Sequence, residues 1–485
     1  MKRLTERLKD RIMSAQDAAR LVKRGMCIGA SGFTLVGCPV LVPREIARQG
    51  TARDLTLLTG ASVVDELDGA LCRAGLLKYR APYQSDKSVR DAINRGTVGY
   101  NDLHLSHMPA QLAHGIGPEI DCAIIECAAV TDDGILLGLS AGASDCFIRH
   151  AKSIILEINR SLPLGLYGMH DIWSPNGRPI DIKAASDRIG APLVPYDPAK
   201  IKAVVINDEA GTFPHFNEPD AVSRAIAENI IAFLKSEVAS GRQPEHLQPI
   251  QSGVGNVANA VLTGLGKGFR GLTMYTEVLQ DGAFRLIEEG VIEKASTTAL
   301  SLSRGCFDSI CKKLDYFRER IVIRPQEISN HPEVIRRLGL ISLNTPIEVD
   351  IYGNVNSTHV MGSYIMNGIG GSGDFARNAG LTIFATGSLA KNGAISCVVP
   401  MVSHVDHTEH DVDVIVTENG VADLRWKTPR ERAVEIIENC SHPDYRPMLR
   451  EYFADACRIT GGQTPHLLSK ALSWHEQYKA AGSMR

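Results

Sequence analysis

Short runs of apolar, β-branched residues alternate with segments of helical periodicity along most of this chain. In the first half these runs lie at 26–30, 55–59, 122–129, 153–158 and 203–206. In the second half they lie at 272–276, 297–302, 321–323, 340–343, 381–385, 394–399 and 412–417. Strands that alternate with helices form parallel or mixed sheets with helices on both faces. The sequence therefore predicts an α/β fold.

The chain has 485 residues, which is too long for one ordinary hydrophobic core, so we expect two domains. Residues 207–220 contain prolines, a glycine and several Asn or Asp residues, which indicates a connector. A long helix is expected at 219–240, ending at Gly241. We predict one α/β domain over 1–216 and a second, of similar size, over 217–485. The last 60 residues are expected to be mostly helical, at 429–439, 446–455 and 466–475.

The composition is that of a globular protein, with 44% hydrophobic and 22% charged residues. A formal net charge of −3 gives no electrostatic reason to expect nucleic acid or an anionic membrane as a partner. The charged N-terminus lacks the apolar core of a secretory signal, and no apolar run is long enough to span a bilayer. The eleven cysteines include no C-x-x-C pair and are expected to be reduced, so we predict a cytoplasmic protein.

Glu277 is the first candidate for chemistry. It follows the predicted strand at 272–276, and the carboxyl ends of strands are where open α/β sheets bind ligands. About twenty residues earlier, Gln251-Ser-Gly-Val-Gly-Asn256 is a glycine-rich turn that opens a helix and can bring backbone N–H groups to an anion. From spacing alone, Glu277 could be a covalent nucleophile or an ordinary acidic residue at a strand end.

The densest glycine cluster is Asn367-Gly-Ile-Gly-Gly-Ser-Gly-Asp-Phe375. It matches G-x-G-x-x-G at Gly368, Gly370 and Gly373, but a dinucleotide site also needs an acidic residue about 20 positions later, and that region offers Lys391 instead. Such glycines can also form an oxyanion hole or a plain tight turn. We therefore disfavour an NAD-linked oxidoreductase.

His404, His407 and His410 lie at spacings of three, beside Asp406 and Glu409, and could form a metal cluster. The segment follows an apolar strand and a proline, so a hydrogen-bonded loop is the favoured interpretation. His170 could be a base, although a structural histidine is the commoner case.

Several long motifs together resemble the acetyl-CoA hydrolase/transferase family of class I CoA-transferases. They are the 251–261 turn and helix, Tyr275-Thr-Glu-Val-Leu-Gln-Asp, Arg324-Pro-Gln-Glu-Ile-Ser-Asn330, Asp350-Ile-Tyr-Gly-Asn-Val-Asn-Ser-Thr, the 367–375 glycine cluster and Val399-Pro-Met-Val-Ser-His-Val-Asp-His. Ser31-Gly-Phe-Thr, Leu58-Thr-Gly-Ala-Ser, Arg80-Ala-Pro-Tyr and Ser441-His-Pro-Asp-Tyr also fit. The resemblance covers nearly the whole chain.

This resemblance implies a fold of two α/β domains with the active site between them, usually as a homodimer. It assigns Glu277 as the nucleophile and the backbone N–H of Gly371 as the donor to the oxyanion. It places Asn330 and Glu418 as residues that orient the acyl group and the nucleophile. The implied CoA contacts are Ser252, Gly253, Val254, Gly255, Asn256, Asn367, Gly371 and Lys391.

The implied reaction moves CoA between succinyl-CoA and a short-chain carboxylate, with acetate preferred, through a glutamyl-CoA thioester and ping-pong kinetics. It needs no metal and no cofactor beyond CoA as a substrate. The alternatives at the same site are a propionyl-CoA:succinate CoA-transferase and an acetyl-CoA hydrolase. A CoA-binding protein without catalysis is disfavoured because the nucleophile position keeps its glutamate.

Overall fold

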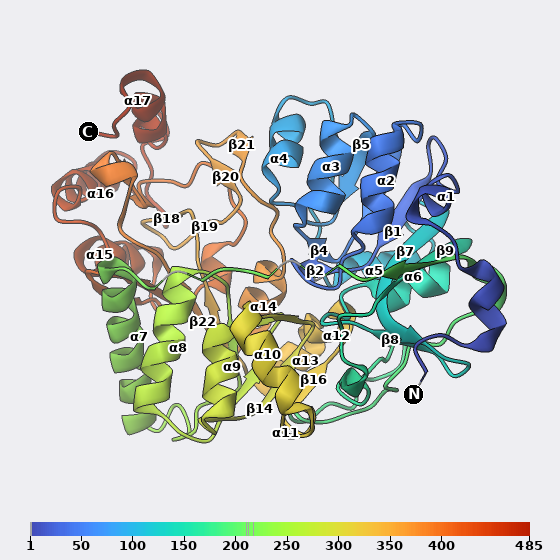
Figure 1. The fold of residues 1–485 in the computed structure, drawn as a ribbon. Coiled ribbons are helices and arrows are strands. Elements are labelled where there is room, and N and C mark those ends of the chain that lie inside the picture. The colour runs from blue at the N-terminus through green and yellow to red at the C-terminus, as the bar shows by residue number, and fades with distance from the viewer. Residues whose placement is uncertain (1, 210, 212, 217) are drawn as a thin grey trace. The chain divides into compact units, whose positions relative to one another are not determined.

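The computed structural model describes every residue of the chain except 1, 210, 212 and 217. Contacts divide the chain into two compact units (Figure 1). The first unit contains residues 1–216 and 274–337, and the second contains 217–273 and 338–485. These units differ from the predicted division in residues 274–337, which pack with the N-terminal part of the chain. The mixed α/β architecture itself confirms the predicted fold class.

An eight-stranded, mostly parallel sheet forms the centre of the first unit. Its strands follow the spatial order β10-β9-β7-β1-β3-β5-β6, and β8 pairs antiparallel with β7. The bounds are β1 (Cys27–Ala30), β3 (Leu55–Leu58), β5 (Leu77–Ala81), β6 (Gly99–Tyr100), β7 (Cys122–Val130), β8 (Ile135–Leu137), β9 (Ser153–Asn159) and β10 (Ile201–Asn207). After β1, the strands β3, β5 and β6 are added on one side of the sheet. After β7, the strands β9 and β10 are added on the other side. The neighbours β1 and β7 therefore mark a topological switch point.

Residues 274–337 add short strands and helices to the first unit. The strand β13 (Val278–Gln280) pairs with β15 (Ala299–Ser301), and β14 (Ile292–Thr297) pairs with β16 (Ile321–Ile323), both in parallel. The helices of the unit are α1 (Ala15–Ala19), α2 (Leu41–Gln49), α3 (Ala70–Arg73), α4 (Lys87–Asn94), α5 (His107–Ala113), α6 (Ser144–His150), α9 (Asp281–Glu288), α10 (Arg304–Lys312), α11 (Leu314–Arg318), α12 (Gln326–Ser329) and α13 (Pro332–Leu338).

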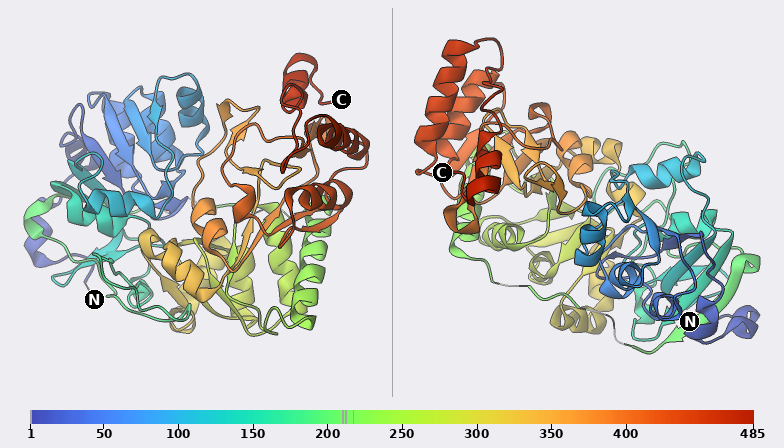
Figure 2. Two further views of the ribbon diagram at one scale, coloured as in Figure 1. Left: turned by 180° about the vertical axis from the view of Figure 1, so that it is seen from behind. Right: turned by 90° about the horizontal axis from the view of Figure 1, so that it is seen from above.

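Four parallel strands form the centre of the second unit, in the order β11 (Ile250–Ser252), β17 (Ile341–Asn344), β22 (Leu381–Ala385) and β26 (Val414–Thr417). The antiparallel β27 (Gly420–Asp423) extends them beyond β26. Two helices, α7 (Ala221–Ala239) and α8 (Asn256–Gly268), lie side by side in both ribbon views (Figures 1 and 2). The remaining helices are α14 (Ser372–Asn378), α15 (Pro429–Asn439), α16 (Arg446–Ile459) and α17 (Ser473–Ala481).

Local sequence signals account for most of these boundaries. The α7 helix begins after Asp220, whose carboxylate accepts the N–H of Ser223 at 2.7 Å. The α15 helix begins after Thr428, which forms a capping box with Glu431, and Pro429 occupies the first helical position. In both helices the cap satisfies N–H groups that the helix cannot pair internally.

Two predicted elements are wrong in detail. The run at 394–399 splits into β24 (Ile395–Ser396) and β25 (Val398–Val399), because the two halves pair with different strands. The helix expected at 466–475 begins only at Ser473, and upstream of it the hydroxyl of Tyr452 accepts the N–H of Leu467 at 3.3 Å.

No helix in the described part of the chain combines the length and the apolar character that crossing a bilayer requires.

Candidate active site

Glu277 lies two residues beyond the end of β12 (Leu272–Tyr275), as the sequence predicts. Its backbone carbonyl accepts the N–H groups of Thr298 at 2.9 Å and Ala299 at 3.2 Å. The hydroxyl of Thr297 donates to the same oxygen at 2.9 Å. Three hydrogen bonds to one carbonyl fix the backbone at this position, so the half-buried side chain starts from a rigid base.

Asn330 holds the carboxylate of Glu277. Its side-chain N–H donates to Glu277 Oε1 at 3.0 Å, and the Asn330 side chain is fully buried. Asn330 caps the C-terminus of α12, whose first residue, Gln326, donates its backbone N–H to Gly142 and its side-chain amide to Leu105. Asn330 and Glu277 are therefore in direct contact in the first unit, and the roles assigned to the two residues stay predictions.

Tyr83 is a neighbour of Glu277 to which the sequence analysis assigned no role. Burial raises the pKa of its hydroxyl, and the negative charge of Glu277 raises that pKa further. The sequence signal for Tyr83 was the motif Arg80-Ala-Pro-Tyr83, which fits the family resemblance. The motif does not indicate which residue Tyr83 lies next to.

A buried ion pair between Arg324 and Asp171 supports the strand ends next to Glu277. Arg324 also donates from Nε to the hydroxyl of Ser296 and from its backbone to Thr297, each at 2.8 Å. Asp171 accepts the backbone N–H of Gly190 at 2.7 Å. These bonds compensate for the burial of both charges, which would otherwise be costly.

The glycine-rich turn Ser252–Asn256 lies at the carboxyl end of β11, in the second unit. The N–H of Gly253 donates to the carbonyl of Leu343 at 2.9 Å, and this bond anchors the turn to the neighbouring strand. Gly255 has φ +108°, a conformation that disfavours any side chain, and Asn256 begins α8 immediately after it. Val254 is 53% exposed, so its apolar side chain is available to a ligand.

Gly371 directly precedes α14, and Gly370 before it has φ +59°. The positive φ of Gly370 produces a sharp turn immediately before the helix, as the glycine cluster predicts. Asn367 donates its side-chain amide to the carbonyls of Gly368 at 2.9 Å and Ser357 at 3.3 Å. The bond to Ser357 therefore holds the Asn367–Gly371 segment against residues 356–358, at the end of a strand.

The His404–His410 segment is a hydrogen-bonded loop that supports this glycine cluster, as the favoured interpretation expects. Asp406 accepts the N–H of Ser357 at 2.6 Å and the hydroxyl of Thr358 at 2.9 Å. His407 shares a hydrogen bond of 3.0 Å with the hydroxyl of Ser372. His404 lies 3.3 Å from Asp406, and these contacts place the side chains of the segment in structural roles.

Glu418 lies beyond a carboxyl end of the second unit's sheet, and Lys391 lies beyond a strand of a separate two-stranded sheet. Glu418 follows β26, and its carboxylate accepts both the N–H of Ser388, at 2.8 Å, and the hydroxyl of the same residue. Lys391 is exposed and begins a 3-10 turn after β23 (Leu389–Ala390). The turn after β11 shares this sheet edge, which in α/β proteins is the edge that binds ligands.

The structure thus brings Glu277 and Asn330 into contact in the first unit. The candidate CoA contacts and Glu418 belong to the second unit. The approach of the Gly371 amide to a carbonyl carried by Glu277 stays a prediction, as do the roles assigned to the individual CoA contacts.

The acetyl-CoA hydrolase/transferase N-terminal domain matches residues 1–209, and the C-terminal domain of the same family matches residues 307–453. The chain is 50% identical to the succinyl-CoA:acetate CoA-transferase of Clostridium kluyveri, over 99% of this chain and 91% of that protein. It is 43% identical to the propanoyl-CoA:succinate CoA transferase of Escherichia coli, over 97% and 98% of the two chains. It is 42% identical to the acetyl-CoA hydrolase of Schizosaccharomyces pombe, over 97% and 95%.

Solved structures resemble the fold at lower identity. RipA from Yersinia pestis matches with a TM-score of 0.71 and 22% identity, over 92% of this chain and 97% of that one. The 4-hydroxybutyrate CoA-transferase from Porphyromonas gingivalis matches with a TM-score of 0.64 and 22% identity, over 91% and 97%. At this identity the likeness concerns the fold alone, and it confirms the predicted fold class. On the family match and the identity over nearly its whole length, this chain belongs to the acetyl-CoA hydrolase/transferase family.

Proposed function

We propose that this protein transfers CoA between succinyl-CoA and a short-chain carboxylate, with acetate as the preferred acceptor. The observation that carries the proposal is the placement of Glu277, which follows a strand end, has its backbone fixed by three hydrogen bonds and has its carboxylate held by Asn330. A carboxylate is a weak nucleophile in water, so it needs this kind of aiming and partial removal from solvent.

The first half-reaction begins when a carboxylate oxygen of Glu277 attacks the thioester carbonyl of succinyl-CoA. A carbon–oxygen bond forms, the carbon–sulfur bond breaks, and the products are a mixed anhydride and the CoA thiolate. The thiolate then attacks the glutamyl carbonyl of the anhydride, which releases succinate and leaves CoA attached to Glu277 as a thioester. An acceptor carboxylate reverses these steps, so the kinetics are ping-pong.

Each attack places negative charge on a carbonyl oxygen. In the proposed site the backbone N–H of Gly371 donates to that oxygen, and one such donor contributes about 10²–10³ in rate. The Ser252–Asn256 turn, Asn367 and the exposed Lys391 would hold CoA, with the ammonium group of Lys391 placed against a phosphate. Every step exchanges one acyl bond for another, so the proposed reaction needs no metal and no cofactor besides CoA. From the family resemblance we propose a homodimer, and from the composition a cytoplasmic enzyme.

Hydrolysis of acetyl-CoA at the same site is the second candidate, favoured by the 42% identity to a protein named acetyl-CoA hydrolase. In that reaction water takes the place of the acceptor carboxylate. Transfer between propionyl-CoA and succinate is a third, favoured by the 43% identity to the Escherichia coli protein. Thioester loss that requires an added carboxylate distinguishes transfer from hydrolysis, and kcat/KM for a panel of acceptors ranks acetate against propionate.

The test of the nucleophile is covalent trapping. The protein is incubated with succinyl-CoA and no acceptor, digested, and examined by mass spectrometry for CoA attached to the peptide spanning 271–285. We expect the adduct in the unmodified protein and in Glu289→Gln, which changes an exposed carboxylate in the same region, and no adduct in Glu277→Gln. A Glu277→Gln variant that transfers CoA at a near wild-type rate would refute the assignment.

A further inference from the structure

A short hairpin of the second unit carries Lys391 at its tip. The strands β23 and β24 pair antiparallel, and residues 391–394 between them form the tip. The base of the hairpin is tied to Glu418, whose carboxylate accepts the N–H of Ser388 at 2.8 Å. The carbonyl of Ser388 accepts the N–H of Cys397 at 2.9 Å, across the base. The hairpin therefore connects Glu418 and Lys391, two residues of the proposed site.

The backbone at this tip is left-handed over three successive residues. Lys391 has φ +50°, Asn392 has φ +54° and Gly393 has φ +87°. A side chain makes this conformation unfavourable, and glycine and asparagine tolerate it best. Lysine holds such a conformation only where surrounding contacts impose it, and these strained positions concentrate at ligand-binding sites. The tip therefore depends on contacts from elsewhere in the unit for its shape.

Tyr445 supplies the first of these contacts. Its hydroxyl donates to the carbonyl of Gly393 at 2.9 Å, and its side chain is fully buried directly before α16. Its ring lies next to Trp474 of α17, with centroids 5.5 Å apart. A buried ring packed in this way fixes the hydroxyl, and the hydroxyl in turn fixes the carbonyl that it binds. The motif Ser441-His-Pro-Asp-Tyr445 fits the family resemblance, but the proposed transfer reaction assigns it no role.

The segment 482–485, which follows α17, supplies two more contacts. Met484 donates its backbone N–H to the carbonyl of Ala394 at 2.9 Å. Arg485 donates from Nη2 to the carbonyl of Gly393 at 3.4 Å. Two successive carbonyls at the end of the tip are thus bound by the same short segment.

The same residues hold the apolar side of the hairpin. Met484 and Tyr445 are fully buried members of one hydrophobic cluster, and Leu389 and Ile395, which flank the tip, pack against that cluster. The guanidinium group of Arg485 lies over the ring of Tyr445, 5.0 Å from its centroid, which is an attractive arrangement. All of these residues belong to the second unit, so the contacts are complete within it.

We propose that Tyr445 and the segment 482–485 are positioning elements for CoA, which hold the tip in the left-handed conformation that presents Lys391 to a CoA phosphate. This inference rests on the proposed function, which assigns Lys391 to CoA. Without the contacts, the tip occupies other backbone conformations as well. The affinity for CoA then falls in proportion to the fraction of molecules in the competent conformation. Tyr445 acts through Lys391 and needs no contact with CoA itself.

The first measurement is the dissociation constant of CoA for the full-length protein, by isothermal titration calorimetry. Tyr445→Phe removes the hydroxyl and keeps the ring. Loss of one hydrogen bond corresponds to about 2–10-fold, so we expect the dissociation constant to rise by that factor. Tyr352→Phe is the matched control, because the Tyr352 hydroxyl is equally buried in the same cluster and donates to the carbonyl of Pro465, outside the hairpin. We expect this control to bind CoA like the unmodified protein.

Two further measurements separate positioning from a general disturbance of the site. In the Lys391→Ala background, Tyr445→Phe should weaken CoA binding no further, because its effect passes through Lys391. Succinyl-pantetheine is a thioester substrate without phosphates, so Tyr445→Phe should leave its kcat/KM unchanged while kcat/KM for succinyl-CoA falls. A residue that disturbs the site in general would lower both values.

Gly393→Ala tests the backbone conformation by itself. A Cβ at this position would meet no described atom closer than 3.7 Å, so its effect comes from the φ of +87°. The cost of a side chain in this conformation predicts CoA binding that is weaker by about fivefold or more. Gly50→Ala is the control, since Gly50 has φ +66° and a Cβ there would meet nothing within 4 Å. It should bind CoA normally.

Each outcome supports or overturns the proposal. A folded Tyr445→Phe variant that binds CoA within about 1.5-fold of the unmodified protein, less than one hydrogen bond predicts, would overturn it. Additive effects with Lys391→Ala, or equal losses with both thioesters, would also overturn it. If Tyr445→Phe does not fold, Gly393→Ala takes its place in the same measurements, and unchanged CoA binding would contradict the proposal.

The results also separate this proposal from the transfer reaction. An unmodified protein that binds CoA but transfers none refutes the transfer reaction alone, because the binding measurements still test the role of Tyr445. An unmodified protein that transfers CoA, with Tyr445→Phe and Gly393→Ala unaffected, refutes the positioning role alone. Absence of CoA binding by the unmodified protein would overturn both.

Discussion

Replacing Asn330 tests how the carboxylate of Glu277 is aimed. The Asn330 amide donates to Glu277 Oε1 at 3.0 Å from a fully buried position. A hydrogen bond to a charged group contributes about 1.5–3 kcal/mol, and about 1.36 kcal/mol corresponds to a tenfold change in rate. If the whole contribution acts in the transition state, Asn330→Ala lowers kcat/KM by about 10–150-fold.

Asn330→Asp is the sharper variant, because it keeps the size of the side chain and changes its charge. A second carboxyl group beside Glu277 makes simultaneous ionisation unfavourable and raises the pKa of the pair. We therefore expect a larger loss of activity than in Asn330→Ala at neutral pH, and a loss that becomes smaller as the pH rises.

The assay measures succinyl-CoA consumption with acetate as acceptor, together with single-turnover formation of the CoA adduct on residue 277. The melting temperature of each variant shows whether it is folded, and Asn94→Ala, at the end of α4, serves as the control. The reasoning fails if Asn330→Ala melts within about 2 °C of the unmodified protein, a change of about 1–2 kcal/mol for a chain of this size, and keeps its kcat/KM within about twofold. A contact of about 1.5 kcal/mol predicts more than tenfold.

Two further predictions concern stability. Burial lowers the pKa of His170 to about 4, so the folded state binds fewer protons than the unfolded state between pH 4 and the unfolded value near 6.5. The free energy of unfolding should fall by up to about 3 kcal/mol as the pH drops through this range. Urea titrations of His170→Gln should show a flatter pH dependence, and an unchanged profile would contradict this origin. Thr428→Ala should cost about 1 kcal/mol by loss of the α15 cap, Thr428→Ser should cost less, and equal urea midpoints for all three proteins would exclude the cap as a contributor.

Local signals in the sequence predicted the regular elements best. The run at 381–385 coincides with β22, because an uninterrupted apolar stretch of this length suits a strand buried on both faces. The α15 helix also matches its prediction, since Thr428, Pro429 and Glu431 form a complete start signal. The helix expected at 466–475 begins only at Ser473, and the bond from the Leu467 N–H to Tyr452, on another helix, is a tertiary contact that the local sequence does not encode.

The candidate site was predicted in part. The position of Glu277 after a strand follows from the apolar run before it, but its contact with Asn330 joins residues 53 positions apart. That contact depends on α12, which is held by Gly142 and Leu105 from distant parts of the chain. No local pattern encodes such a placement, and only the resemblance to a known family indicated Asn330 beforehand.

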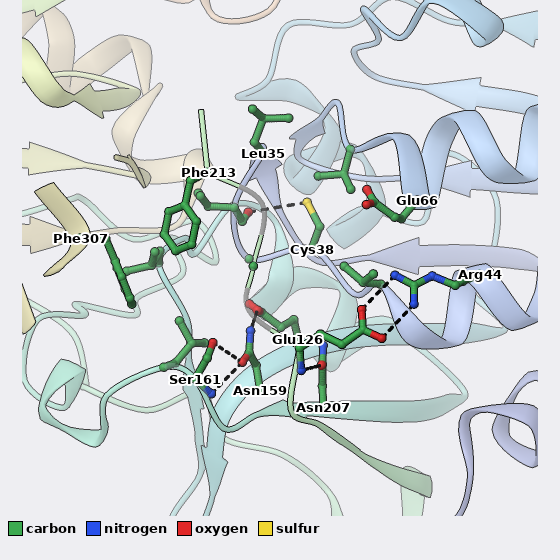
Figure 3. Close-up of a pocket in the computed structure, with 18 residues that line it drawn as sticks. Leu35, Cys38, Arg44, Glu66, Glu126, Asn159, Ser161, Asn207, Phe213 and Phe307 are labelled. Carbon is green, nitrogen blue, oxygen red and sulfur yellow. Dashed lines mark hydrogen bonds and ion pairs between the residues drawn. The ribbon is translucent and has the colours of Figure 1, made fainter. Parts of the chain in front are cut away.

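Glu126, which lines a cavity together with Cys38 and Asn159 (Figure 3), is a sequence signal that was available but was not used in the prediction. The run at 122–129 was interpreted as an apolar strand, and all nine residues of β7 are buried. A glutamate within such a strand is a local conflict between hydrophobic pattern and charge, and such conflicts concentrate at functional or strained positions.

Three glutamates of the first unit illustrate why a carboxylate has no fixed chemical role. Glu157 accepts the backbone N–H groups of Val40, Leu41 and Val42 at the start of α2, and burial raises its pKa. Glu126 is buried, receives the Asn159 amide on one oxygen and has its pKa raised to about 8, so it is neutral at pH 7. Glu277 is half-buried on a fixed backbone and takes the Asn330 amide on Oε1, which in the proposed reaction orients the carboxylate for attack. Since burial and hydrogen-bond donors set these roles, the sequence can indicate where a carboxylate lies on a strand but the packed structure determines whether it caps, titrates or reacts.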